Sequence, residues 1–231
     1  MSFKKNKYVV IKQAIPKDLA TFIYNYFLMK RQVYDTCLKT KYISPYEEFL
    51  GGYREISLQV PNTYFCYADI AMETLMLKCH PIMEKITGLK LQPAYSYARL
   101  YKTGDVLKRH KDRFSCEIST TMYLGGDPWL IHLSPYENVG RSEIHGGKKG
   151  ITLESKAKGI KVNLKPGDML VYRGCELEHW RNKFKGKDCA QVFLHYNDEK
   201  TTGSKENIFD QRPHLGLPGW FQKVRLPTPK K

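Results

Sequence analysis

The sequence lacks the features that mark a membrane, secreted or disulfide-stabilised protein. No apolar run approaches the roughly 20 residues that a transmembrane helix needs. The basic start MSFKKNKYVV has no long apolar region of a secretory signal. The six cysteines include no Cys-x-x-Cys pair, which argues against a zinc knuckle. We therefore expect a cytoplasmic protein with reduced thiols, without membrane partners.

Acidic residues are scarce relative to basic ones. The chain has 38 Lys and Arg against 23 Asp and Glu, a formal net charge of +15. This excess favours anionic partners, nucleic acid among them. The basic residues are dispersed, however, and no basic-aromatic pattern is organised as a stacking platform for bases. Nucleic acid stays open as a partner, beside the alternative of solubility with weak non-specific binding.

The first part of the chain predicts a strand and two helices. Hydrophobic residues make up 42% of the 231 residues, enough for the core of one domain. A short strand is predicted over 8–12, and a helix follows Pro16 with apolar residues at helical spacing. A second helix is predicted to start near Pro61 or Asn62 and to run through PIMEKITG. Both helices are expected to be packing elements.

After residue 90 the pattern changes to short strands that are separated by Gly and Pro turns. The predicted strands are 95–101, 108–113, 117–125, 129–134, 150–155, 159–164, 168–174 and 190–197. Helices followed by such strands indicate an α+β protein with a jelly roll, also called a double-stranded β-helix. We divide this single domain into an N-terminal strand with support helices (1–90), a jelly-roll core (91–200) and a C-terminal surface tail (201–231).

Two potential metal ligands, His110 and Asp112, lie two residues apart on one predicted strand. Positions i and i+2 of a strand point to the same face, so the imidazole and the carboxylate can converge. A third ligand, His179, follows the predicted strand MLVYRG. Two histidines and one carboxylate compose the facial triad of non-haem Fe(II) sites. Chance examples are common in a chain with seven histidines, so ordinary surface or core positions remain the alternative.

The segment YSYARLY places polar side chains on one face of a strand. Tyr95, Tyr97, Arg99 and Tyr101 alternate with Ser96, Ala98 and Leu100. Three phenols and a guanidinium each need a polar partner when buried. This face is therefore expected to line a wet cavity.

The segment from about 95 to 197 resembles the 2-oxoglutarate- and Fe(II)-dependent dioxygenases, particularly the prolyl 4-hydroxylase-like group. RLYKTGDVLKRHKD, ISTTMYL, KPGDMLVY, ELEHW and AQVFLHY occur in the order of that family. The resemblance implies Fe(II) bound by His110, Asp112 and His179, with 2-oxoglutarate and O₂ as co-substrates and ascorbate as an accessory reductant. It implies hydroxylation of a C–H bond with succinate and CO₂ as co-products. Related halogenases lack the carboxylate, so Asp112 favours hydroxylation.

The resemblance also implies a pocket for the distal carboxylate of 2-oxoglutarate, which needs a cation and a hydroxyl. Tyr101 takes the place of a tyrosine that hydrogen-bonds this carboxylate in prolyl-hydroxylase-like enzymes. The usual Arg or Lys early in the closing strand is missing, because Asp188 and Cys189 hold those positions. Some other basic residue is therefore expected to supply the charge.

Three residues compete to supply that charge. Arg181 is the first choice, because on a continuing strand it would share a face with His179. Lys187 would serve if the loop NKFKGK shifts its register, and Arg99 shares a strand face with Tyr101. Gln191 is expected to add a hydrogen bond to the co-substrate.

A peptide or protein is the first hypothesis for the primary substrate, because the resemblance is closest to prolyl 4-hydroxylases. Tyr97, Tyr123 and Trp180 are predicted to line the substrate pocket, with Trp129 nearby. The alternatives are an alkylated base in nucleic acid and a free amino acid or other small metabolite. A further alternative from another class is a non-catalytic jelly-roll binding module.

Overall fold

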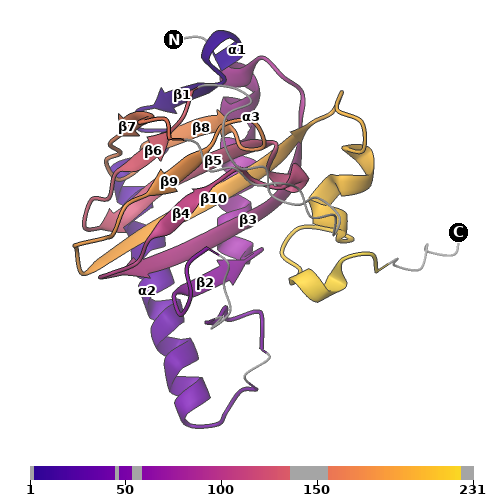
Figure 1. The fold of residues 1–231 in the computed structure, drawn as a ribbon. Coiled ribbons are helices and arrows are strands. Elements are labelled where there is room, and N and C mark those ends of the chain that lie inside the picture. The colour runs from indigo at the N-terminus through magenta and orange to yellow at the C-terminus, as the bar shows by residue number, and fades with distance from the viewer. Residues whose placement is uncertain (1–2, 45–46, 54–58, 136–155, 225–231) are drawn as a thin grey trace, which may run out of the picture.

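Two antiparallel sheets form the centre of the molecule (Figure 1). The computed structural model describes residues 3–44, 47–53, 59–135, 156–224. The larger sheet has the order β1-β8-β5-β10-β3-β2 and the smaller one the order β4-β9-β6-β7. The larger sheet comprises β1 (Tyr8–Ile11), β2 (Tyr64–Tyr67), β3 (Leu91–Lys102), β5 (Ile118–Gly126), β8 (Met169–Arg173) and β10 (Asp188–Asp198). The smaller sheet comprises β4 (Leu107–His110), β6 (Ile131–Leu133), β7 (Ile160–Val162) and β9 (His179–Arg181).

Side chains from both sheets line the space between them. Tyr101, Leu170 and Tyr172 of the larger sheet form one buried cluster with Leu107 and Ile131 of the smaller sheet. Side chains of a strand alternate between its faces, so each strand sends every second residue into this interior. This arrangement is the α+β jelly roll that the sequence predicted, and it gives the interior room for a site.

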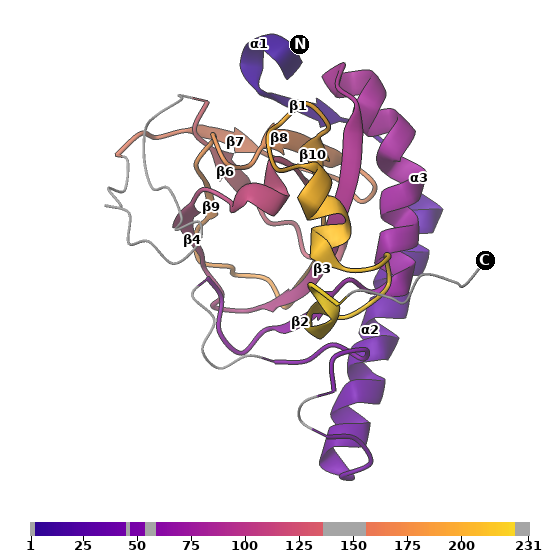
Figure 2. The same cartoon turned by 90° about the vertical axis from the view of Figure 1, so that its right-hand side faces the viewer.

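Two long helices cover the outer face of the larger sheet, and Figure 2 shows both on the same side of the strands. They are α2 (Lys17–Lys39) and α3 (Ile70–Thr87), while α1 (Phe3–Asn6) precedes β1. Phe27 of α2 and Met76 of α3 are fully buried in the same cluster as Met122 and Val192 of the sheet. The predicted packing role of both helices follows from these contacts.

The second helix begins later than the sequence suggested. Tyr64–Tyr67 forms the edge strand β2, which pairs with β3, so the start at Pro61 or Asn62 was wrong. The helix begins after Asp69, whose carboxylate accepts a hydrogen bond from the backbone N–H of Met72 at 3.1 Å. A helix cap of this kind outweighs the preference of proline for a first turn.

Several strand limits differ from the prediction. The predicted strand 108–113 ends at His110, so Asp112 lies in the loop beyond β4 rather than on the strand. The short strand β9 was not predicted as a separate strand. The candidate 150–155 lies outside the described residues. The remaining predicted strands are present with ends shifted by up to a few residues.

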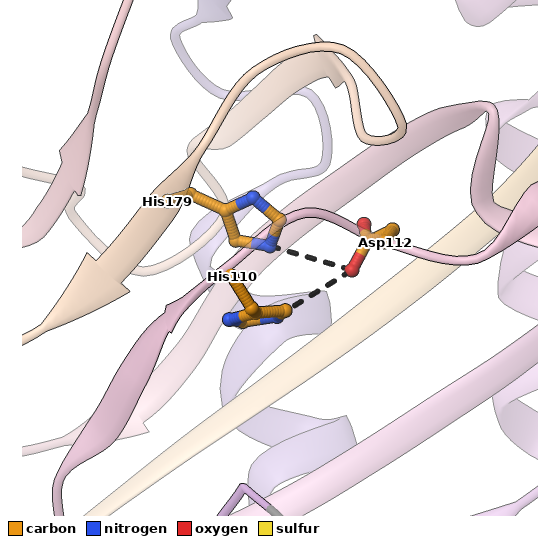
Figure 3. Close-up of side chains that lie close together, drawn as sticks. All are labelled: His110, Asp112 and His179. Atoms are coloured by element: carbon orange, nitrogen blue, oxygen red, sulfur yellow. Dashed lines mark ion pairs between the residues drawn. The ribbon is translucent and has the colours of Figure 1, made fainter. Parts of the chain in front are cut away.

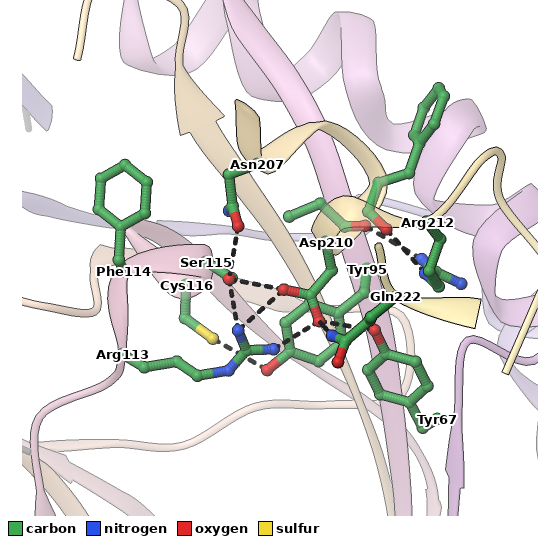
Figure 4. A network of polar contacts seen from close by, with 12 residues as sticks. Tyr67, Tyr95, Arg113, Phe114, Ser115, Cys116, Asn207, Asp210, Arg212 and Gln222 are labelled. Atoms are coloured by element: carbon green, nitrogen blue, oxygen red, sulfur yellow. Dashed lines mark hydrogen bonds and ion pairs between the residues drawn. The ribbon is translucent and has the colours of Figure 1, made fainter. Parts of the chain in front are cut away.

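The described part of the C-terminal tail is anchored by two buried charged residues. Asp210 accepts two hydrogen bonds from Arg113, at 2.8 and 2.7 Å (Figure 4). Arg212 pairs with Glu73 of α3 at 2.7 Å. Asp210 and Arg212 are both nearly inaccessible to solvent. The tail thus makes buried charged contacts as well as lying on the surface.

All six cysteines are free thiols, and four of them are buried. Within the described ranges, no helix has the length and apolar character needed to cross a membrane.

Candidate metal and co-substrate site

Neighbouring strands β4 and β9 bring the three predicted metal ligands together (Figure 3). His110, the last residue of β4, pairs in register with His179, the first residue of β9. Asp112 follows two residues later, and its Oδ1 lies 3.5 Å from His110 Nε2 and 3.4 Å from His179 Nε2. The three ligand atoms all lie within 4.8 Å of one another. One ion can therefore contact all three.

Backbone carbonyls orient both imidazoles. His110 Nδ1 lies 2.7 Å from the carbonyl of Lys108, and His179 Nδ1 lies 3.0 Å from the carbonyl of Leu177. A carbonyl can only accept, so each Nδ1–H donates, and each Nε2 is the ring nitrogen that is left to face Asp112. This orientation is typical of metal-binding histidines. The donor set fits a divalent transition metal.

Asp112 is held by its backbone and by Ser119. Its N–H donates to the carbonyl of Gly174 at 2.9 Å, and Ser119 Oγ donates to its Oδ2 at 2.9 Å. The other oxygen, Oδ1, is left to face the two imidazoles. Burial raises the pKa of Asp112, but His179 and His110 outweigh it and hold the pKa well below its usual value. The side chain is therefore a carboxylate, as metal binding requires.

Sequence reasoning missed Ser119 and His195, which support Asp112. His195 Nδ1 lies 2.9 Å from the Ser119 hydroxyl, and Cys116 completes a second group of potential ligand atoms with Asp112 and His195. Burial lowers the pKa of His195 to about 4, so this imidazole is neutral at physiological pH. The run Ser119–Thr121 within an otherwise apolar strand was the signal that could have revealed this support.

The potential metal ligands face a cavity of about 200 Å³. Tyr95, Tyr97, Arg99 and Tyr101 all line it, which confirms the prediction from their alternation along β3. Tyr172 of β8 and Phe193 of β10 close other parts of the wall.

Arg181 is not among the residues that line this cavity, but it lies close to Tyr101 and Tyr172, which do. It is 1% exposed, and it donates to Thr121 Oγ1 at 3.2 Å and to the carbonyl of Trp129. Its Nε is buried without a hydrogen-bond partner. No carboxylate among the described residues forms an ion pair with it, and burial lowers its pKa. A buried cation of this kind is costly unless a ligand supplies the counter-charge.

Hydroxyl and amide groups surround Arg181. Thr121 Oγ1 accepts from Arg181 and donates to Gln191 Oε1 at 3.0 Å, so Gln191 reaches the guanidinium through Thr121. The Tyr101 hydroxyl forms no hydrogen bond with another described residue. Burial raises the pKa of Tyr101 to about 12 and keeps this hydroxyl protonated. Tyr101 and Tyr172 both lie close enough to act on the Arg181 charge. Sequence reasoning missed Thr121 and Tyr172, although they lie in the segments ISTTMYL and KPGDMLVY that carry the family resemblance.

The two other candidate cations have different surroundings. Arg99 lines the cavity and donates to the carbonyl of Val60 and to the Tyr97 hydroxyl, each at 2.9 Å. Lys187 is exposed in the loop between β9 and β10, and its backbone N–H donates to Asp127 at 2.6 Å. The structure therefore brings Arg99, and not Lys187, to the wall of the cavity.

Of the predicted substrate-pocket residues, Tyr97 lines the cavity, whereas Tyr123 and Trp180 do not. The hydroxyl of Tyr123 donates to the carbonyl of Gly126 at the end of β5. Trp180 stacks on His132 with ring centroids 5.2 Å apart, and Arg109 lies over its ring at 3.4 Å. Trp180 points away because it alternates with His179 and Arg181 along β9.

A larger groove of about 820 Å³ adjoins the cavity. Tyr95 and Tyr97 line both, so the two spaces share a wall. Phe65 stacks on Tyr97 with centroids 5.4 Å apart and forms part of the groove. The charged residues that line the groove are Glu47, Glu48, Arg113 and Asp210.

Comparisons with known proteins give matches in structure alone. No family model matches the chain, and no curated protein matches it in sequence. A prolyl 4-hydroxylase from Pseudomonas putida is 12% identical, with 85% of this chain and 95% of that chain covered, at a TM-score of 0.54. The non-haem α-ketoglutarate-dependent epimerase SnoN of nogalamycin biosynthesis is 13% identical, with 85% and 80% covered, at a TM-score of 0.57.

A third similar structure is HygX from Streptomyces hygroscopicus with nickel and 2-oxoglutarate bound. It is 13% identical, with 87% of this chain and 86% of that chain covered, at a TM-score of 0.50. Identities this low carry information about the fold. The chain therefore has the jelly-roll fold of the 2-oxoglutarate- and iron-dependent oxygenases.

Proposed function

We propose that the protein is an Fe(II)- and 2-oxoglutarate-dependent dioxygenase that hydroxylates a C–H bond of a peptide or protein, with succinate and CO₂ as co-products. One observation carries the proposal. A buried His–Asp–His group faces a cavity beside a buried arginine that has no ion-pair partner in the described ranges. The first group suits a metal ion, and the second suits the distal carboxylate of a dicarboxylate co-substrate.

The metal is held by His110 Nε2, His179 Nε2 and Asp112 Oδ1 in this proposal. Lys108 and Leu177 fix the two imidazoles through their carbonyls, and Ser119 fixes the unused oxygen of Asp112. Iron held by these residues would supply the oxidation of the C–H bond with O₂ and 2-oxoglutarate, and ascorbate would keep the iron reduced. The residues of the chain hold the ligands in place and exclude bulk water from the cavity.

Arg181 anchors the distal carboxylate of 2-oxoglutarate, with the hydroxyl of Tyr101 as a further donor, while Thr121 accepts from the guanidinium and helps to hold it in place. Its fork geometry suits a carboxylate, and binding would give the buried guanidinium the counter-charge that it lacks. Gln191 orients Thr121 from the other side, at 3.0 Å. Lys187 is a poorer candidate because it is exposed.

An extended peptide fits the two adjoining spaces better than a free metabolite does. The cavity of about 200 Å³ is smaller than most ligand pockets and must also hold the co-substrate. The groove of about 820 Å³ offers room for the rest of a longer substrate, along Tyr95 and Tyr97. Arg113 and Asp210 in the groove pair with each other, which leaves the carboxylates of Glu47 and Glu48, and these disfavour the phosphates of nucleic acid. A free amino acid, which would occupy the cavity alone, is the second candidate.

Succinate formation tests the proposal. The protein with Fe(II), ascorbate and labelled 2-oxoglutarate is incubated with pools of peptides, with oligonucleotides and with free amino acids. We expect succinate in the wild type, stimulated by peptides, and none in His179→Ala at an unchanged melting temperature. If iron binds but 2-oxoglutarate is not consumed under any of these conditions, the protein is a non-catalytic binding module.

A further inference from the structure

A second buried arginine, Arg99 of β3, lies in the wall of the cavity itself. It is 5% exposed, and its guanidinium donates to the carbonyl of Val60 and to the hydroxyl of Tyr97, each at 2.9 Å. The rings of Tyr97 and Tyr101 flank it, with centroids 5.3 and 5.9 Å from Arg99 Cζ. These contacts fix the position of the side chain but bring no negative charge to it.

The charge of Arg99 has no ion-pair partner within the described ranges of the chain. Asp105 acts on it only from beyond ion-pair distance, and its carboxylate is already paired with Lys102 at 2.9 Å. A guanidinium that is shielded from water and lacks an anion is unfavourable. Arg99 is also the only Arg or Lys among the described residues that line the cavity.

The proposed co-substrate does not use Arg99. One end of 2-oxoglutarate would contact the metal, and its distal carboxylate would contact Arg181, whose partners are Thr121 and Trp129. Arg99 instead contacts Tyr97, which lines both the cavity and the groove. It therefore stands on the side from which a primary substrate would enter.

We propose that Arg99 binds a carboxylate of the primary substrate, so that the substrate presents an acidic group close to the carbon that is oxidised. This inference rests on the proposed function. A carboxylate matches the single positive charge and the planar fork of one arginine. A phosphate dianion would need further cations, and the described lining residues provide none. The carboxylate comes from an acidic side chain of a peptide or from a free acidic amino acid.

Binding measurements separate the two arginines. The protein is loaded with Mn(II), and the Kd of 2-oxoglutarate is measured by calorimetry for the wild type, Arg99→Gln, Arg99→Lys and Arg181→Gln. In the presence of Mn(II) and 2-oxoglutarate, ligand-observed NMR then measures binding of hexapeptide pairs that differ by Asp against Asn or Glu against Gln. Free Asp, Asn, Glu and Gln form the second arm, which distinguishes the two sources of the carboxylate.

We expect the wild type to prefer acidic ligands over their amides by about tenfold or more. Arg99→Gln should abolish this preference and change the Kd of 2-oxoglutarate by less than about twofold, while Arg99→Lys retains part of the preference. Arg181→Gln should raise the Kd of 2-oxoglutarate by about tenfold or more. Melting temperatures confirm that each variant is folded.

Two results would overturn the inference. A rise in the Kd of 2-oxoglutarate in Arg99→Gln, as large as in Arg181→Gln, would make Arg99 a co-substrate anchor. Equal binding of acidic and amide ligands to the wild type would leave Arg99 a structural residue. Failure of the proposed function looks different, because the Mn(II)-loaded wild type would then not bind 2-oxoglutarate at all.

Discussion

Arg181 lies between the two sheets of the jelly roll and Arg212 lies in the C-terminal tail. Both are almost fully buried, but they differ in their partners. Arg181 is 1% exposed and Arg212 is 3% exposed. Arg212 pairs with Glu73 at 2.7 Å and donates to the carbonyls of Leu217 and Ala94. Arg181 donates only to the hydroxyl of Thr121 and the carbonyl of Trp129 among the described residues, and its Nε is buried without a hydrogen-bond partner.

The difference separates a residue that holds the fold together from one that, in the proposed function, binds an anionic ligand. Glu73 balances the charge of Arg212, so the pair joins the tail to α3 without any other molecule. No carboxylate among the described residues balances the charge of Arg181, and in the proposed function the co-substrate does so. Uncompensated buried charges are a common mark of functional sites, because folding alone gains little from them.

Removing Asp112, the proposed metal ligand, should have the largest effect on the site between the two sheets. Asp112→Ala deletes the only carboxylate of the proposed metal site and leaves two imidazoles. Mn(II) affinity should fall by more than about 100-fold, and succinate formation should be lost. Calorimetric metal titration measures the first effect. Glu206→Ala, which removes an exposed carboxylate, is the matched control and should change neither quantity.

Removing Glu73 should cause the largest loss of stability, because Glu73 is the ion-pair partner of Arg212 in the tail. Glu73→Ala leaves Arg212 buried and unpaired, which should lower the free energy of unfolding by roughly 3–5 kcal/mol. Chemical denaturation measures this loss. Lys90→Ala breaks an exposed ion pair with Glu84 and should cost less than about 1 kcal/mol. A Glu73 variant as stable as the wild type would remove the distinction between the two arginines.

Arg181→Gln should weaken ligand binding and leave the stability of the fold nearly unchanged. The variant loses the proposed anchor of 2-oxoglutarate, so the Kd of 2-oxoglutarate should rise by roughly 10–100-fold, while Mn(II) affinity stays nearly the same. Stability should not fall as it does in Glu73→Ala, because no buried ion pair is broken. Lys187→Ala, which removes an exposed cation of the neighbouring loop, should change the Kd by less than about twofold. An equal rise in both variants would contradict the assignment.

The smallest effect concerns the pH dependence of the tail. Burial alone would raise the pKa of Asp210, but hydrogen bonds from Arg113, Ser115 and Tyr67 outweigh it and lower the pKa to about 2. Because this folded-state pKa lies below the unfolded value, Asp210 stabilises the fold above about pH 4 and loses that contribution as the pH falls through 2. Asp210→Asn should cost roughly 2 kcal/mol at pH 7. In denaturation curves, the difference from the wild type should disappear near pH 2; a constant difference would argue against the ionised pair.

The sequence predicted the jelly roll because alternation and turns are local signals. The strands around residues 95–101 and 190–197 were placed correctly, and the alternation along the first of them identified a cavity wall. The start of the second helix was placed too early, because Pro61 was taken as a first-turn residue and Asp69 was not considered as its cap. Competing local signals of this kind are decided by tertiary pairing, here of β2 with β3.

Side-chain direction was the main limit at the site. Trp180 alternates with two residues that were assigned to the cavity, so its outward direction could have been inferred from the sequence. Tyr123 could not have been excluded, because nothing local reports that its hydroxyl bonds to Gly126 at the strand end. That no carboxylate of the described ranges pairs with Arg181 is likewise a property of the assembled fold, since its neighbours come from β3, β5 and β8.

A crystal structure of the protein with Mn(II) and 2-oxoglutarate, prepared without O₂, tests the central claim most directly. We expect the metal on His110 Nε2, Asp112 Oδ1 and His179 Nε2, with the distal carboxylate of 2-oxoglutarate on the Arg181 guanidinium and the Tyr101 hydroxyl. A distal carboxylate bound to Arg99 or Lys187, with Arg181 still without a carboxylate, would contradict it, as would a metal bound away from these three residues.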